Sequence, residues 1–210
     1  MKTLTVQEII NRVRTKIDEI AVNESEMEEA DSDNLNLNTI IKSCIADAYR
    51  YVSLNADISL LEGKVVESPV MVIGDDMVAR ITLPSDFLRL VNVRLKSWIS
   101  APSVIIDEYS AEYRMQSNKW LCGTPARPVA ALVRVKEGRQ VELYKASSKD
   151  DSVKVLAYIP SLESDMSSVE LPVQVIDAFI HYVAALTLVT LREESSADHF
   201  KIAQNLLGIG

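Results

Sequence analysis

The chain has 210 residues, of which 48% are hydrophobic and 25% charged, a balance typical of a globular protein with one large or two small domains. Its formal net charge of −8 disfavours free nucleic acid and anionic membranes as partners, and therefore a sequence-specific DNA-binding function. The N-terminus lacks a continuous apolar segment and a small-residue cleavage site, which predicts a cytosolic chain. Cys44 and Cys122 lie far apart in different contexts and are predicted to be free thiols.

The first predicted element is an amphipathic helix over residues 5–22. Thr5 and Glu8 have capping-box spacing, and apolar residues then recur every three or four positions. The following segment, 23–34, contains six acidic residues and no basic one, which predicts a solvated loop. It lacks the DxDxDG pattern of a calcium loop. A second helix is expected from an N-cap at Asn38 to about Ala56.

From Lys64 onward the hydrophobic period changes to that of short β-strands separated by turn residues. Residues 74–76 and 137–139 are expected to form hairpin turns, and 107–118 a short helix or irregular segment. In LPSDFLRLV, 83–91, proline and two small polar residues predict a chain reversal rather than an active-site loop. The strand after it is expected to place four residues on one face: Phe87, Arg89, Val91 and Val93.

After Leu171-Pro172 a helix is predicted over 173–191, followed by another over 196–207. The first is long and apolar enough for a membrane span, but polar residues such as Gln174, Asp177 and His181 favour a buried protein helix. Its apolar residues cover more than one face, so we expect a neighbouring subunit to cover part of it. The expected inter-subunit contacts are Phe179, Val183, Leu186 and Leu188.

These elements predict an α+β fold in which N- and C-terminal helices pack as a helical bundle and an antiparallel β-rich domain is inserted between them. The expected segments are 1–63 for the first helices, 64–168 for the inserted domain and 169–210 for the last helices. The acidity belongs to the helices, because the net charge is −6 for 1–63, 0 for 64–170 and −2 for 171–210.

The sequence gives no reason to expect an enzyme, a cofactor or a metal site. It contains no GxSxG, HExxH, CxxC or P-loop pattern, and its two histidines, His181 and His199, have no second His or Cys at ligand spacing. We interpret His181 as a core or interface histidine. The aromatic residues of the β-rich domain could form a sugar-binding or base-stacking platform, but core and inter-subunit packing is favoured for them; they are Trp98, Trp120, Tyr109 and Tyr113.

Three stretches together resemble the head-to-tail connector proteins of tailed bacteriophages, which are also called adaptor, neck or ring proteins. They are LPSDFLRLVNVRLKSW (83–98), EYRMQSNKWLCGTPARPVAAL (112–132) and LPVQVIDAFIHYVAALTLVTLREESSADHFKIAQNLL (171–207). The three stretches, taken with their order and spacing, extend over about half of the chain.

The resemblance implies a virion structural protein that forms a ring of twelve subunits below the portal, joins head to tail and extends the DNA channel. Its partners would be the other copies in the ring, the portal protein, the adjacent tail or ring protein, and double-stranded DNA passing without sequence-specific contacts; no membrane is involved. The expected portal-docking residues are Phe200, Leu206, Leu207 and Ile209, and an acidic surface facing the channel is expected at Glu24, Glu26, Glu28 and Glu29. The alternatives are a carbohydrate-binding or adhesion module, another tail-assembly role such as tail completion, and a small enzyme such as a carboxylate-dependent hydrolase.

Overall fold

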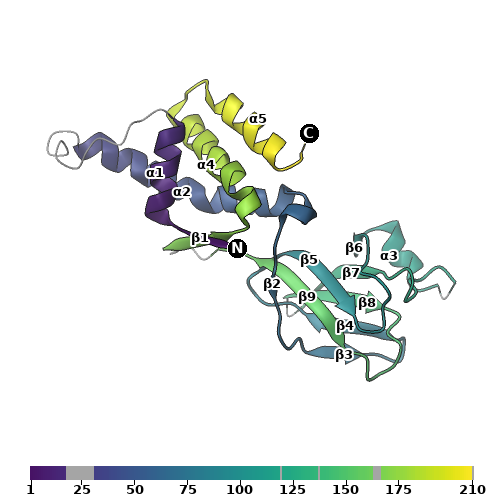
Figure 1. Ribbon diagram of the computed structural model, residues 1–210. Helices are drawn as coiled ribbons and strands as arrows, with labels where there is room; N and C mark the ends of the chain where they lie inside the picture. The colour runs from purple at the N-terminus through teal and green to yellow at the C-terminus, as the bar shows by residue number, and fades with distance from the viewer. Residues whose placement is uncertain (18–30, 119, 137, 163–166, 210) are drawn as a thin grey trace. The chain divides into compact units, whose positions relative to one another are not determined.

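The computed structural model describes residues 1–17, 31–118, 120–136, 138–162 and 167–209. It divides into two compact units, Met1–Glu62 with Ser161–Gly210, and Gly63–Pro160 (Figure 1). The first, here the helical unit, contains both ends of the chain. The second, here the β unit, contains the strands between them. Helices and mainly antiparallel sheets together give an α+β fold, which confirms the predicted class.

Within the described residues, the helical unit contains four α-helices and one two-stranded sheet. α1 (Val6–Lys16) begins at the predicted capping box, in which the Glu8 amide donates to Thr5 Oγ1 and the Thr5 amide donates to Glu8 Oε2. β1 (Lys2–Thr5) precedes it and pairs antiparallel with β10 (Ser168–Leu171). This pairing, which the sequence did not predict, joins the N-terminus to the segment that leads into the C-terminal helices.

α2 spans Asp31–Asn55 and so begins well before the expected N-cap at Asn38. The prediction of an N-cap at Asn38 is therefore wrong, because Asn38 lies within the helix. The predicted loop is also wrong for 31–34, whereas the remainder of that acidic segment, 23–30, lies outside the described residues. The Asp, Ser and Asn residues of 31–34 have low helix propensity individually, but a helix that is packed further along can extend through them.

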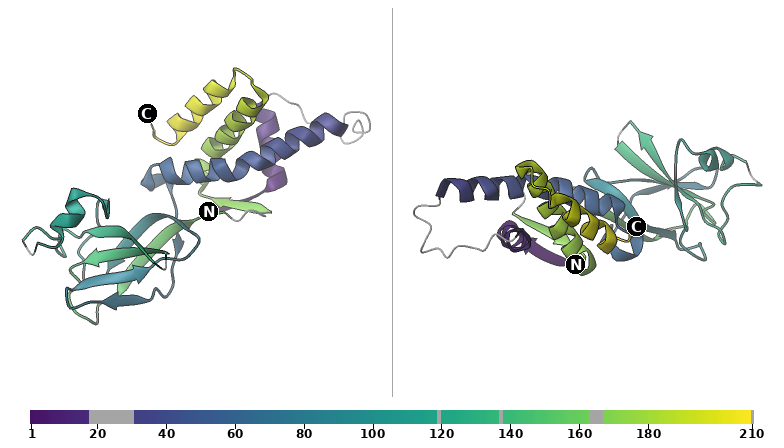
Figure 2. Two further views of the ribbon diagram at one scale, coloured as in Figure 1. Left: turned by 180° about the vertical axis from the view of Figure 1, so that it is seen from behind. Right: turned by 90° about the horizontal axis from the view of Figure 1, so that it is seen from above.

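Helix α4 (Ile176–Leu191), preceded by the 3-10 turn η3 (Val173–Val175), is the centre of the helical unit. It contacts α1, α2 and α5 (Ser196–Leu206), and two views show it flanked by α1 and α5 while α2 runs across them (Figure 2). Its segment 173–191 passes the length and hydropathy test for a membrane span, but more than half of it is buried in the protein. The interpretation as a buried protein helix is consistent with this packing.

Aromatic contacts connect three helices of the helical unit. The Tyr182 ring of α4 stacks on Tyr51 of α2 at a centroid distance of 4.0 Å, and meets Phe200 of α5 edge-on at 5.2 Å. One side chain thus fixes three helices relative to one another, since stacked and edge-to-face rings at these distances are favourable arrangements.

The β unit consists of two sheets that share one core. One sheet has the order β2-β9-β5, formed by Lys64–Val65, Val153–Pro160 and Phe87–Leu95. The other has the order β3-β4-β8-β7-β6, formed by Met71–Ile73, Val78–Thr82, Gly138–Tyr144, Ala130–Val135 and Ile105–Asp107. Side chains from both sheets meet around Trp98, which is almost fully buried. The short helix α3 (Ala111–Met115) follows β6.

The turn predicted at LPSDFLRLV is confirmed, because the Phe87 amide donates to the Pro84 carbonyl and β5 begins directly afterwards. The expected single face of β5 is wrong. Register shifts against β9 interrupt its alternation, so the residues that become buried are Phe87, Leu90, Val93 and Leu95. A strand that contains bulges loses its strict period of two.

The central position of α4 leads to a stability prediction. Phe179 is completely buried in the helical unit, so Phe179→Ala should lower the free energy of unfolding by about 3–5 kcal/mol through lost burial and a cavity. Chemical denaturation followed by far-UV circular dichroism measures this. The control is Val173→Ala, at a position that is 65% exposed, which should change stability by less than about 0.5 kcal/mol. Equal effects of the two substitutions would contradict the central role of α4.

Candidate functional site

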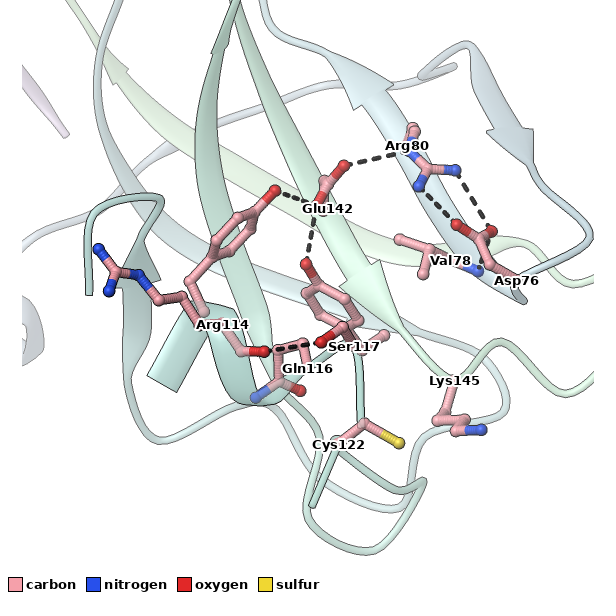
Figure 3. Close-up of a pocket in the computed structure, with 11 residues that line it drawn as sticks. Asp76, Val78, Arg80, Arg114, Gln116, Ser117, Cys122, Glu142 and Lys145 are labelled. Atoms are coloured by element: carbon pink, nitrogen blue, oxygen red, sulfur yellow. Dashed lines mark hydrogen bonds and ion pairs between the residues drawn. The ribbon is translucent and has the colours of Figure 1, made fainter. Parts of the chain in front are cut away.

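A hollow with a volume of about 650 Å³ lies in the β unit, between α3 and the strands β4 and β8. Asp76, Arg80 and Glu142 line its strand side, and Arg114, Ser117 and Cys122 contribute from α3 and the segment after it (Figure 3). Both aromatic and charged side chains line it, and it is therefore the first place to look for chemistry.

Glu142 is the central group of this pocket and is only 8% exposed. Its Oε1 accepts from Arg80 Nε at 3.1 Å, and its Oε2 accepts from the hydroxyls of Tyr144 at 2.8 Å and Tyr113 at 3.2 Å. The remaining Arg80 nitrogens donate to Asp76, with Nη2 to Oδ2 at 2.6 Å. Every charge in this cluster thus has an opposite charge or a hydrogen-bond donor beside it.

The electrostatics of the cluster favour a structural role. Burial, and then the hydrogen bond to Glu142, raises the pKa of Tyr144, and burial followed by the Glu142 charge raises the pKa of Tyr113. The hydrogen bonds from Arg80 hold the pKa of Asp76 below its usual range. Neutral tyrosines and a paired carboxylate provide no poised base or nucleophile. The main effect of the cluster is to attach α3 to β8, because Tyr113 belongs to α3 and Glu142 to β8.

Sequence reasoning missed this cluster. The sequence shows only a charged residue inside each of two strands with alternating apolar residues: Arg80 in VARIT and Glu142 in GRQVELY. The sheet pairs these two residues directly across β4 and β8. Without knowledge of which strands pair, the sequence cannot bring them together.

The aromatic platform considered from the sequence does not form as a set of four. Trp98 is in the core, where its indole N–H donates to the Lys145 carbonyl at 3.4 Å, and Tyr113 is tied to Glu142. Trp120 and Tyr109 remain on the surface, with exposed fractions of 82% and 73%. Core packing is thus the correct interpretation for Trp98.

The residues predicted for inter-subunit contact occupy mixed positions. Phe179, Val183 and Leu188 are buried within the helical unit itself, so in this structure they contact the chain's own helices. Leu186 is half-buried, and its contact with another subunit stays a prediction.

Of the predicted docking residues, Leu207 is buried and Phe200 packs on Tyr182, whereas Leu206 is 45% exposed and Ile209 is half-buried. Within this set, exposed apolar surface is therefore concentrated on Leu206 at the end of α5. The residues predicted to face a channel, Glu24, Glu26, Glu28 and Glu29, lie outside the described residues.

The two histidines, which are distant in sequence, meet where α4 contacts α5. Their Nδ1 atoms are 3.0 Å apart, so one ring donates a hydrogen bond to the other. His181 is 9% exposed, and burial, then Lys16 of α1 and His199 of α5, lower its pKa, while Asp177 of α4 opposes the shift. No group of three or more metal-ligating side chains occurs among the described residues. The pair therefore acts as a hydrogen bond between two helices.

By family, the chain is a structural adaptor protein of bacteriophages and is associated with the virion. The SU10 adaptor protein family matches residues 4–209, nearly the whole chain, and the chain belongs to that family. A comparison with curated proteins finds no match. The resemblance to phage adaptor proteins noted in the sequence is confirmed at this level, and the family is not typically enzymatic.

The buried cluster allows a test of its structural role. Glu142→Gln leaves one oxygen to serve three donors, so at least one buried donor loses its acceptor and the β unit should lose about 1–3 kcal/mol of stability. Trp98 fluorescence in a Trp120→Phe background reports unfolding of this unit, because the protein has two tryptophans. Glu112→Gln on the exposed face of α3 is the control and should be near neutral. If both variants unfold at the same denaturant concentration, the cluster does not stabilise the unit.

The histidine pair predicts a loss of stability in mild acid. The folded state holds His181 neutral, whereas the unfolded chain takes up a proton near pH 6.5, so the contribution is present above about pH 6.5 and is lost as the pH falls further. When both rings are protonated, both Nδ1 atoms carry a hydrogen, and the hydrogen bond between His181 and His199 is lost. Thermal unfolding of the wild type and of His181→Gln at a series of pH values measures the effect. A slope between about pH 6.5 and 5 that is the same in both proteins would contradict it.

Proposed function

We propose that this adaptor protein is a head-to-tail connector, which assembles as a ring of twelve subunits below the portal and extends the channel for DNA. Membership of the SU10 adaptor protein family over residues 4–209 is the observation that carries the proposal. In this role the protein retains the packaged genome, guides its ejection and presents a platform for the next tail or ring protein.

The distribution of charge supports a channel function. The two segments that build the helical unit, 1–62 and 161–210, carry a net charge of −11, whereas the β unit, 63–160, carries +3. A negatively charged wall repels DNA phosphates, so a duplex can slide past it without binding. We propose the acidic segment that includes Glu24, Glu26, Glu28 and Glu29 as part of this wall.

The end of the chain supports docking on the portal. α5 ends in Leu206, whose side chain is 45% exposed, and Ile209 follows it. Phe200 and Leu207 pack inward and hold α5 on the helical unit. An exposed apolar end supported by buried neighbours is suited to insertion into a complementary pocket of a partner.

Assembly on the portal provides the test. The purified protein, alone and mixed with the portal protein of the same phage, should form ring-shaped particles of twelve copies in electron microscopy, with a mass that agrees by light scattering. Leu206→Asp should weaken portal binding about tenfold or more without changing the melting temperature, because it places a charge on the proposed contact. Lys201→Gln, on the exposed surface of the same helix, changes the net charge by the same −1 and is the charge-matched control. A protein that remains monomeric with and without the portal would contradict the function.

A further inference from the structure

The β unit presents an exposed apolar surface next to α3. Trp120 is 82% exposed, Leu121 59% and Met115 48%, and a series of turns from Met115 to Cys122 places them on one short stretch of chain. Soluble monomers seldom leave several large apolar side chains together in water. This surface therefore indicates a contact with another protein.

The segment of chain that carries these apolar residues is also basic. Arg114 and Arg127 are exposed, and their guanidinium groups make no hydrogen bond or ion pair to any described residue. Residues 111–127 carry a net charge of +2, although the whole chain carries −8. We call the five residues that combine these properties the α3 patch: Arg114, Met115, Trp120, Leu121 and Arg127.

The α3 patch is held rigidly in place by its own unit. The Tyr113 hydroxyl attaches α3 to the buried Glu142, the Gly123 amide donates to Gln116 Oε1 at 2.9 Å, and Thr124 and Arg127 close a tight turn through paired backbone hydrogen bonds. A surface that is ordered before binding loses less conformational entropy when a partner docks. The polar cluster around the buried Glu142 thus positions the α3 patch.

The helical unit carries a surface of opposite charge where α4 turns into α5. Val189 and Leu191, on the last turn of α4, are 51% and 42% exposed, and Glu193 and Glu194 follow them on the surface. Residues 191–198 carry a net charge of −2. Arg192 closes the helix in a left-handed conformation, and the Glu193 amide donates to the Leu188 carbonyl at 2.9 Å, so the corner has a defined shape. We call these four residues the α4 corner: Val189, Leu191, Glu193 and Glu194.

We propose that the α3 patch of one copy docks on the α4 corner of the neighbouring copy. The proposal rests on the ring assembly proposed above and identifies the surfaces through which copies associate. Charge complementarity is the argument for a second copy as the occupant, because exposed arginines flank apolar side chains on one surface and exposed glutamates follow apolar side chains on the other. Two different surfaces in contact make a heterologous interface, which repeats from copy to copy and can close into a ring.

This arrangement differs from the interface expected from the sequence. Phe179, Val183 and Leu188 serve the interior of the helical unit, whereas the last turn of α4 reaches the surface. The apolar character of 173–191 therefore divides into two parts. The middle of the helix builds the bundle, and its end contributes to contact between copies.

Charge reversal tests the interface. Arg114→Glu with Arg127→Glu makes both docking surfaces acidic, and Glu193→Lys with Glu194→Lys makes both basic, so each double variant alone should assemble with an affinity lowered about tenfold or more. In an equimolar mixture every α3 patch can meet a corner of opposite charge on the other variant. The mixture should therefore recover the wild-type mass in analytical ultracentrifugation.

Two controls separate this effect from a general change in charge or folding. Lys136→Glu with Lys154→Glu changes the net charge of the β unit by the same amount at exposed positions outside the patch, and should assemble normally. Trp120→Ala should weaken assembly, whereas Val70→Ala, at a position 81% exposed in the same unit, should not. Unchanged circular dichroism and melting temperature establish that each variant folds.

The outcomes distinguish this interface from the proposed function. If wild type and both charge-reversed variants form rings equally well, alone and on the portal, the interface is wrong and the connector function stands. If the variants assemble normally but lose portal binding, the α3 patch contacts the portal instead, and the proposal is overturned. A wild type that forms no ring in either condition overturns both. Loss in each variant with recovery in the mixture supports the α3 patch and α4 corner as partners.

Discussion

A helix without a continuous polar face must be covered on every side, and the helical unit is organised by that requirement. The middle of α4 is buried, and α1 and α2 from one end of the chain, with α5 from the other, provide its cover. The β1–β10 pairing adds a second connection between the two ends, because it joins the N-terminal strand to the segment that precedes α4. Neither end of the chain provides this cover alone. The hydrophobic effect thus makes the two ends one folding unit.

In the chain, the β unit lies between the two segments that build the helical unit. The strands β2 and β9, which begin and end the β unit, pair antiparallel with Lys64 opposite Tyr158. The chain therefore enters and leaves the β unit through neighbouring strands. A Cβ on Gly63 would come within 2.9 Å of the Tyr158 amide nitrogen, so glycine permits the close approach of the two strands at the crossing. The β unit keeps its own core around Trp98.

Sequence patterns predicted the parts of this architecture that depend on local information. The capping box at Thr5, the turn at Pro84 and the apolar helix after Pro172 each rest on neighbouring residues, and the structure contains all three. Features that depend on pairing were missed. β1 and β10 are strands because they pair with each other, and the β5 register depends on its bulges against β9. The start of α2 was misjudged because packing further along a helix can outweigh the low propensity of its first residues.

The surfaces proposed for contact between copies also depend on contacts between residues that are distant in the sequence. Arg80 and Glu142 are ordinary charged residues in their own strands and form an ion pair only when β4 lies beside β8. Their partner Tyr113 then fixes α3, and α3 determines where Arg114 and Met115 reach the surface. In the helical unit, the neighbouring helices bury the middle of α4 and leave Val189 and Leu191 on its last turn exposed. In each unit, an interior that completes its own packing leaves a defined apolar surface beside a net charge, which is positive near α3 and negative at the end of α4. For the interface proposed above, that combination provides specificity, because the apolar groups favour association in general and the charges select which surfaces meet.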